Sequence, residues 1–189
     1  CAAVAHQLRI DLGAFGQRGA VIVGSNGKGS TAAMCASVLT QNTDKVGLFT
    51  SPHLFALNER FRIADEDISD AELGVHWAKV RVAIEACGVE QDIGGFEFLF
   101  LIAASCFEAR GCVHTIWEAG IGGRLDPVKL IGASNVALTA LDYEHTALLG
   151  NTLSEIAVEK VSATPDGARL VVSENAAAAG SGVRAAILD

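Results

Sequence analysis

The sequence has little of what marks disordered, fibrous or membrane-spanning chains. Only 19% of its 189 residues are charged, while 50% are hydrophobic. This balance excludes a disordered or fibrous protein and leaves enough apolar residues for one well-packed core. No apolar run reaches the roughly 18 residues that a membrane span needs. The longest candidate, residues 96–107, contains Glu97 and is better explained as a buried helix.

Cysteines are few and lack the spacing of a metal or disulfide framework. There are five, an odd number, and no two of them form a C-x-x-C pair. Most lie among apolar residues, so we expect buried thiols in a reducing cytoplasm and neither a disulfide framework nor a zinc site.

Positive charge is also scarce. The formal net charge of −8 argues against a nucleic-acid-binding or anionic-membrane surface, so neither partner is expected. There is no signal peptide, and the sequence opens on Cys1 instead of Met. We therefore expect it to be part of a longer or processed chain.

A glycine-rich segment after a short β-branched run is the strongest signal that is present. Residues 21–31 read Val-Ile-Val-Gly-Ser-Asn-Gly-Lys-Gly-Ser-Thr, and an alanine-rich, helix-favouring stretch follows to about Gln41. A strand that enters a helix through such a turn directs backbone N–H groups and the positive end of the helix dipole at one point, which suits a triphosphate. Lys28 would add a mobile cation, and Ser30 or Thr31 a hydroxyl for Mg²⁺.

The spacing departs from the usual G-x-x-x-x-G-K-[ST] phosphate loop, because position 22 is Ile and Gly29 separates Lys28 from Ser30. The alternative is a tight turn with a solvated lysine. Three glycines, a lysine and two hydroxyls in a strand–turn–helix context favour nucleotide binding.

Strand and helix patterns alternate along the chain. Buried strands are expected near residues 45–51, 112–117, 135–141 and 169–173, and helices over residues 69–87, 96–110 and 152–163. This alternation predicts an α/β fold with a mostly parallel sheet flanked by helices. Glycines at 13, 16 and 19 suggest that residues 1–20 form a loop. We expect residues 1–175 to form one P-loop ATP-binding domain and residues 176–189, with four successive alanines, a linker or poorly ordered tail.

Polar residues follow several of these strands. In parallel sheets ligands lie beyond the carboxyl ends of the strands, where Ser51, Glu118 and His145 are expected beside the phosphate loop. A carboxylate that leaves an apolar run needs a compensating cation, and Mg²⁺ takes hard oxygen ligands such as Ser30, Ser51 and Glu118. For an isolated histidine, a capping or core role is the alternative.

Taken together, these motifs resemble the folylpolyglutamate synthase/dihydrofolate synthase branch of the Mur ligase superfamily. The match runs from about residue 20 to residue 173, and no single motif carries it. Its segments are 24–31, 50–54, 58–60, 96–99, 118–126, 145–146, 149–150, 152, 156–157 and 159–160.

The resemblance implies the central domain of an ATP-dependent ligase that joins L-glutamate to a folate or dihydropteroate carboxylate through an acyl phosphate. It implies that residues Asn26, Gly27, Lys28, Gly29, Ser30 and Thr31 bind ATP, that Ser51, Glu118 and His145 hold Mg²⁺, and that Lys160 is carbamylated and binds a second Mg²⁺. It also implies that Phe96, Glu97 and Leu125 contact the substrate, and that Lys28, Glu118, His145 and Lys160 are catalytic. From composition alone, Lys160 would be an exposed helix lysine.

Several residues depart from the family pattern near the expected acceptor site. Pro127-Val128-Lys129 replaces Ala-Thr-Asn, Gly94-Gly95 replaces Thr-x, and Glu144 stands where an aspartate usually precedes the histidine. A Mur-type ligase for another carboxylate and amine, a non-catalytic ATP-binding module, and a plain P-loop NTPase or kinase therefore stay open. The resemblance also implies a C-terminal ligase domain that is absent here, so we expect this chain alone to be an inactive ligase and a monomer.

Overall fold

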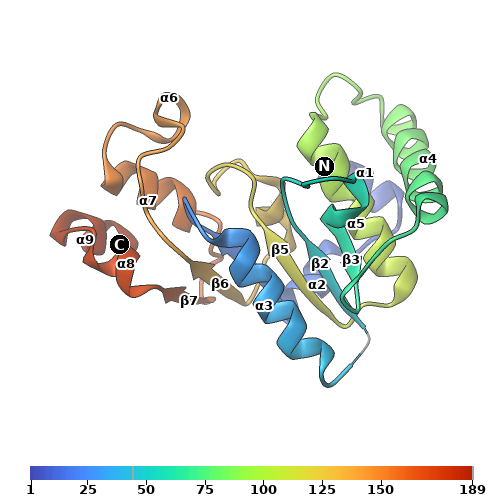
Figure 1. The fold of residues 1–189 in the computed structure, drawn as a ribbon. Coiled ribbons are helices and arrows are strands. Elements are labelled where there is room, and N and C mark those ends of the chain that lie inside the picture. The colour runs from blue at the N-terminus through green and yellow to red at the C-terminus, as the bar shows by residue number, and fades with distance from the viewer. Residues whose placement is uncertain (44, 189) are drawn as a thin grey trace.

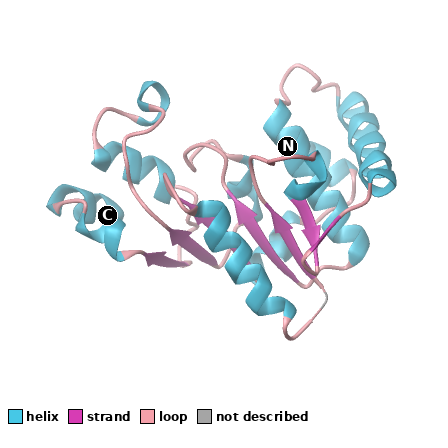
Figure 2. Ribbon diagram, in the orientation of Figure 1, coloured by secondary structure: helices cyan, strands magenta, loops and turns pink. Residues whose placement is uncertain are grey.

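The computed structural model describes residues 1–43 and 45–188, which form an α/β fold (Figures 1 and 2). Its strands are β1 (Gly19–Val23), β2 (Val46–Phe49), β3 (Phe61–Ile63), β4 (Glu66–Asp67), β5 (His114–Glu118), β6 (Asn135–Leu138) and β7 (Arg169–Val172). Its helices are α1 (Ala2–Gln7), α2 (Leu12–Gln17), α3 (Lys28–Thr40), α4 (Asp70–Cys87), α5 (Gly95–Arg110), α6 (Thr146–Leu149), α7 (Leu153–Val161), α8 (Glu174–Ala178) and α9 (Ser181–Leu188), with short 3-10 helices η1 (Leu57–Arg60) and η2 (Pro127–Ile131). Within this described part, no helix has the length and hydrophobicity to cross a membrane.

The described strands form one sheet in the order β4-β3-β2-β5-β1-β6-β7. Strands β2, β5, β1, β6 and β7 are parallel, and β3 and β4 add an antiparallel edge. The predicted mostly parallel sheet is confirmed. The chain leaves β1 first toward β5 and β2 and later toward β6 and β7, so the carboxyl end of β1 is a point where the strand order reverses. Ligands bind at such points in open α/β sheets.

Alternating residues of the strands face two different cores. Val21 and Val23 pack with α2, α5 and η2 on one face of the sheet, whereas Ile22 packs against Ala32 and Ala36 of α3 on the other. Figure 1 shows α3 lying in front of the sheet. The small alanine side chains let α3 approach the strands closely, and this fixes the position of its N-terminal end.

Trp117 of β5 is the centre of the larger core. It is fully buried, and its ring lies 5.1–6.0 Å, centroid to centroid, from the rings of Phe15, Phe49, Phe100 and Phe107. Aromatic residues at such distances contribute both buried area and favourable ring geometry.

We expect Trp117→Ala to lower the free energy of unfolding by about 3–5 kcal/mol, because it leaves a cavity under several aromatic rings. Urea unfolding followed by circular dichroism measures the change. Trp77→Ala is the matched control, since Trp77 is 42% exposed and should cost less. Equal losses in the two variants would contradict the central role of Trp117.

Two segments differ from the sequence-based expectation. Residues 1–20 contain helices α1 and α2 instead of a loop. The expected linker at 176–189 forms helices α8 and α9 as far as residue 188, and Val183 is buried in the core beside α7. Alanine has the highest helix propensity, so an alanine run with an apolar residue to bury favours helix over linker.

Candidate functional site

The phosphate loop lies between β1 and α3, as the sequence predicts. Gly24 and Gly27 have positive φ angles of 147° and 78°, and α3 begins at Lys28. A side chain at Gly24 would also overlap the hydroxyl of Thr139. The loop therefore needs glycine at both positions, and it ends at the N terminus of a 13-residue helix, whose first amides have no partner inside the helix. Such an N terminus suits an anion.

Side chains hold the carbonyl groups of this loop. The Nζ of Lys28 donates to the carbonyl oxygens of Gly24 (2.9 Å) and Ser25 (3.4 Å), and the hydroxyl of Thr139 donates to that of Asn26 (2.7 Å). Lys28 is thus folded back onto its own loop. Because a lysine side chain has several rotatable bonds and lies at the helix N terminus, Lys28 could exchange these contacts for an anion.

Glu118, the last residue of β5, lies against the start of α3 and against Ser51. Its Oε2 accepts a hydrogen bond from the backbone N–H of Ser51 at 2.8 Å, and a Cβ added to Gly29 would lie 3.3 Å from the same oxygen. Gly29 thus leaves room for the carboxylate. Ser51, Gly29 and Glu118 line one cavity of about 400 Å³.

The Glu118 carboxyl is only 3% exposed, and burial raises its pKa. The Ser51 amide, the charge of Lys28 and the Gly29 amide oppose this shift and favour the ionised form. A buried carboxylate in the same cavity as a serine, next to a helix N terminus, offers hard-oxygen donors of the kind that Mg²⁺ uses together with phosphate oxygens. The residues present therefore fit a magnesium ion.

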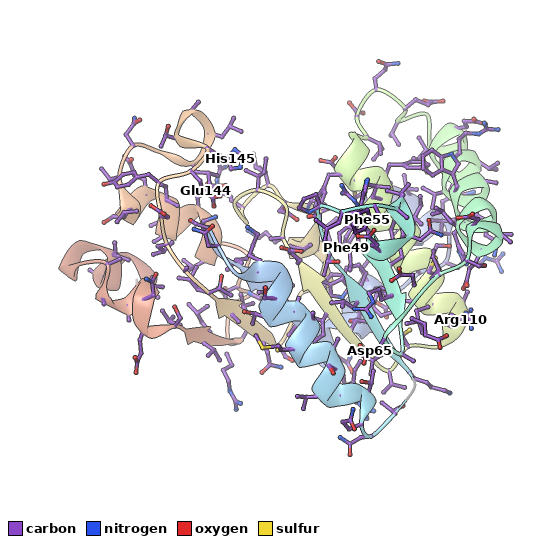
Figure 3. The ribbon with its side chains drawn as sticks, in the orientation of Figure 1. Phe49, Phe55, Asp65, Arg110, Glu144 and His145 are labelled. Carbon is purple, nitrogen blue, oxygen red and sulfur yellow. The ribbon has the colours of Figure 1, made fainter. Side chains whose placement is uncertain are left out.

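The Glu59 carboxylate orders the segment that follows Ser51. The Glu59 carboxylate accepts hydrogen bonds from the N–H groups of Leu54, Phe55 and Ala56 at 2.7–2.8 Å. These bonds lower the pKa of Glu59. Phe55 lies outside the fold at 93% exposure (Figure 3).

Lys160 is buried and reaches the phosphate loop from α7. It is one of the largest fully buried side chains, with only 1% of the residue exposed, so a cationic group lies inside the core. The Nζ donates to the Gly24 carbonyl oxygen at 3.0 Å and to Oε1 of Glu144 at 2.6 Å. Burial lowers the pKa of Lys160, while Glu144 opposes that shift. The interpretation of Lys160 as an exposed helix lysine is wrong.

His145 is the predicted residue that the structure does not join to the others. It is exposed, has a φ of 44°, and precedes the short helix α6 without capping it through its side chain. Figure 3 shows it beside Glu144. In residues 1–43 and 45–188, no hydrogen bond or ion pair links it to Ser51 or Glu118, and no three His, Cys, Asp or Glu side chains converge as a metal site. Its role as a metal ligand stays a prediction.

The three predicted substrate residues lie together in a second cavity. Phe96, Glu97 and Leu125 line a space of about 350 Å³, with Leu148 and Leu149 on another wall. Gly120, two residues after Glu118, also lines it, and the ring of Phe96 packs on this glycine. The two cavities therefore adjoin the same end of β5. Apolar walls with a few acidic groups suit a flat ligand that carries hydrogen-bond donors.

Asp126 organises this cavity, although the sequence-based prediction did not include it among the site residues. Its carboxylate accepts hydrogen bonds from the backbone N–H groups of Gly120 (2.8 Å), Ile121 (3.3 Å) and Val128 (3.0 Å). Burial raises its pKa to about 6, and these three bonds oppose the shift. Two sequence signals could have indicated it: Asp126 ends the matched segment 118–126, and it directly precedes Pro127 at the start of a short helix.

The raised pKa predicts a pH dependence of stability. Between about pH 4 and pH 6 the folded state keeps a proton on Asp126 that the unfolded state releases, so rising pH lowers the free energy of unfolding by up to about 3 kcal/mol. We expect Asp126→Ala to reduce this slope in urea unfolding measured across that range. Glu118, whose pKa is also raised, contributes a slope of the same sign. An unchanged slope in the variant would contradict the burial of Asp126.

No family model matches the chain, but the similar proteins and solved structures include several folylpolyglutamate synthases. The probable bifunctional folylpolyglutamate synthase/dihydropteroate synthase of Haloferax volcanii is 35% identical over 151 residues, which are 79% of this chain and 18% of that protein. E. coli FolC in complex with DHPP and ADP superposes with a TM-score of 0.83 and 25% identity, over 99% of this chain and 43% of that one. An FPGS-AMPPCP-folate complex superposes with a TM-score of 0.85 and 34% identity, over 98% of this chain and 46% of that one. The chain thus spans less than half the length of these relatives.

Proposed function

Because the chain belongs to the folylpolyglutamate synthase/dihydrofolate synthase family of Mur ligases, we propose that it is the ATP-binding part of an amide ligase that adds L-glutamate to a folate or dihydropteroate carboxylate. One observation carries the proposal. The phosphate loop, the Glu118–Ser51 cavity and the cavity of Phe96, Glu97 and Leu125 meet at the carboxyl ends of β1 and β5. A nucleotide and an acceptor bound in these two places would be neighbours.

The proposed reaction has two steps. An oxygen of the acceptor carboxylate attacks the γ-phosphorus of ATP, which forms an acyl phosphate and releases ADP. The amine of glutamate then attacks the acyl carbon, phosphate leaves, and the amine loses a proton to solvent. Both steps concentrate negative charge, so positioning and electrostatic stabilisation account for most of the catalysis.

We propose the following roles for the chain's own residues. The amides of residues 26–31 and the N terminus of α3 bind the phosphates. Lys28 exchanges its bonds with the loop carbonyls for phosphate oxygens, because a free anion at the helix N terminus attracts it more strongly than a neutral carbonyl. Phe96, Glu97 and Leu125 hold the acceptor beside the end of β5.

Mg²⁺ would be held by Ser51, Glu118 and, in the working enzyme, His145. When bound, it would neutralise charge on the transferring phosphoryl group. The buried Glu118 carboxylate supports this assignment, since burial raises its pKa and a cation would offset that cost. Lys160 in its carbamylated form would supply a further carboxylate-like ligand for a second Mg²⁺, as the resemblance implies.

We further propose that the working ligase has a second domain for the incoming amino acid, because the relatives are more than twice as long as the aligned chain. The chain alone would then bind nucleotide without ligating. We also propose a monomer in the cytoplasm, and the five free thiols support the reducing compartment. Analytical ultracentrifugation tests the monomer.

The full-length protein tests the function directly. Incubation with ATP, glutamate and Mg²⁺ is expected to release ADP only when dihydropteroate or folate is added, with a product one glutamyl residue heavier by mass spectrometry. If ADP is released with another carboxylate and amine but with neither folate substrate, the protein is still a ligase, and the proposed folate acceptor is wrong. Nucleotide binding without turnover of any acceptor would favour a non-catalytic module.

A further inference from the structure

Two lysines, one from the start of α3 and one from α7, donate to the same carbonyl oxygen of the phosphate loop. The Gly24 oxygen accepts a hydrogen bond from Lys28 at 2.9 Å and another from Lys160 at 3.0 Å. Lys160 lies on α7, and its second partner, Glu144 at 2.6 Å, lies on the segment between β6 and α6. Figure 1 shows the N-terminal end of α3 beside α7, and Figure 3 shows Glu144 on this side of the loop.

The ammonium groups of Lys28 and Lys160 repel each other, because both donate to one oxygen. The Lys160 ammonium is also almost inaccessible to solvent. A buried cation is stable only when it is paired and its hydrogens are bonded. Glu144 supplies the compensating charge, with 24% of its own side chain exposed. The other anionic group that acts on Lys160 is Glu159 on the same helix, but its carboxylate is engaged by Arg124 at 2.8 Å. Glu144 is therefore the anion that keeps Lys160 on the loop.

We propose that Glu144 is a positioning residue, which holds the Lys160 ammonium against the Gly24 carbonyl and so fixes the phosphate loop before nucleotide binds. We call the chain Glu144–Lys160–Gly24 the loop tether. The inference rests on the proposed function only in taking residues 24–30 as the phosphate-binding loop. The tether also joins that loop to α7 and to the segment that carries His145.

The length of the side chain at position 144 matters for this role. At 2.6 Å, the bond to Lys160 leaves no slack for a shorter side chain, such as that of aspartate, on the same backbone. The length of the Glu144 side chain therefore allows its direct contact with Lys160.

The loop tether and a carbamate on Lys160 exclude each other. A carbamate would place a negative charge beside the Glu144 carboxylate and the Gly24 carbonyl oxygen, where the ammonium now donates two hydrogen bonds. The tether consequently describes the amine form of Lys160, and carbamylation would require Glu144 to move away. The phosphate loop is thus held differently in the two forms.

Hydrogen–deuterium exchange of the phosphate-loop amides tests the tether without any reaction. The full chain is measured in CO₂-free buffer, without nucleotide or metal, as wild type, Glu144→Gln, Lys160→Met and the double variant. We expect each single variant to exchange the amides of residues 24–30 about tenfold faster, which is the effect of losing a charged hydrogen bond. The double variant should exchange no faster than Lys160→Met, because both changes break the same tether.

Two further variants keep the test decisive. Lys160→Arg keeps a cation that can bond both partners but cannot be carbamylated, so its loop should stay protected even if Lys160→Met folds poorly. Glu85→Gln breaks an exposed ion pair with Arg81 on α4 and should leave the loop unchanged. Unaltered loop exchange in Glu144→Gln, or additive effects in the double variant, would overturn the tether.

The outcomes separate this inference from the proposed function. Faster loop exchange in a protein that ligates no folate would support the tether and overturn the acceptor assignment. If the protein ligates folate but substitution of Glu144 leaves the loop exchange unchanged, the acceptor assignment is supported and the tether is overturned. Thermal unfolding of each variant shows whether a change in exchange is local to the loop or reflects loss of the whole fold.

Discussion

Lys28→Ala is expected to reduce ATP-dependent ligation by the full-length protein about a thousandfold or more. The reason is that Lys28 is the mobile cation at the N terminus of α3, where charge develops on the phosphoryl group. The measurement is steady-state ADP release with glutamate and a folate substrate. Nucleotide affinity, measured by titration calorimetry, should fall as well, since Lys28 contacts phosphate in the ground state too.

The fold should survive this substitution. The Lys28 side chain bonds only carbonyl groups of its own loop, and Lys160 still holds the Gly24 oxygen. Lys79→Ala, an exposed lysine of α4, is the matched control and should keep full activity. Substantial turnover in Lys28→Ala would remove the basis for a phosphate-binding role of the loop.

Glu118→Gln is expected to cause a loss of similar size, with a distinct dependence on Mg²⁺. The amide keeps the shape of the carboxyl group and its contact with the Ser51 N–H, but it lacks the charge that would hold the cation. We therefore expect the Mg²⁺ concentration for half-maximal ADP release to rise steeply, and saturating Mg²⁺ to restore only a small part of the activity. Glu90→Gln, an exposed carboxylate, is the control.

The same substitution should make the metal-free fold more stable. Burial raises the pKa of Glu118, so at neutral pH the folded state holds a buried charge that the unfolded state exposes to water. Removing the charge removes that cost, and the melting temperature in EDTA should rise. A variant that is inactive and more stable is typical of a residue kept for function. Lower stability in EDTA would instead indicate a structural role.

Most of the local structure around the candidate site was predictable, because its signals lie close together in the sequence. The phosphate loop needs only a strand, glycines and a helix in sequence. Helix α4 (Asp70–Cys87) is capped by Ser69 and Gly88 and matches the helix expected over residues 69–87. Glu118 was predictable from its place at the end of an apolar run. Such features depend on neighbours in the chain.

The failures came from residues whose partners are distant in sequence. Gly16 suggested a loop, but it lies inside α2. Glycine is needed at this position because a side chain would overlap the carbonyl group of Ile131 in η2. This glycine serves close packing of two elements, which a sequence pattern cannot distinguish from a turn. Lys160 lies on the same face of α7 as the buried Ile156 and Ala157, but its partner Gly24 is 136 residues away, so the local pattern could not identify the groups that compensate a buried lysine.

Consecutive residues of β5 serve the core and the site. Trp117 is clamped among four aromatic rings, and the next residue along the same rigid strand is the carboxylate that faces the phosphate loop. The position of the carboxylate that we propose as a magnesium ligand therefore depends on the packing around Trp117. Substitutions among these aromatic rings, far from the proposed ligands, would be expected to weaken Mg²⁺ binding by shifting Glu118.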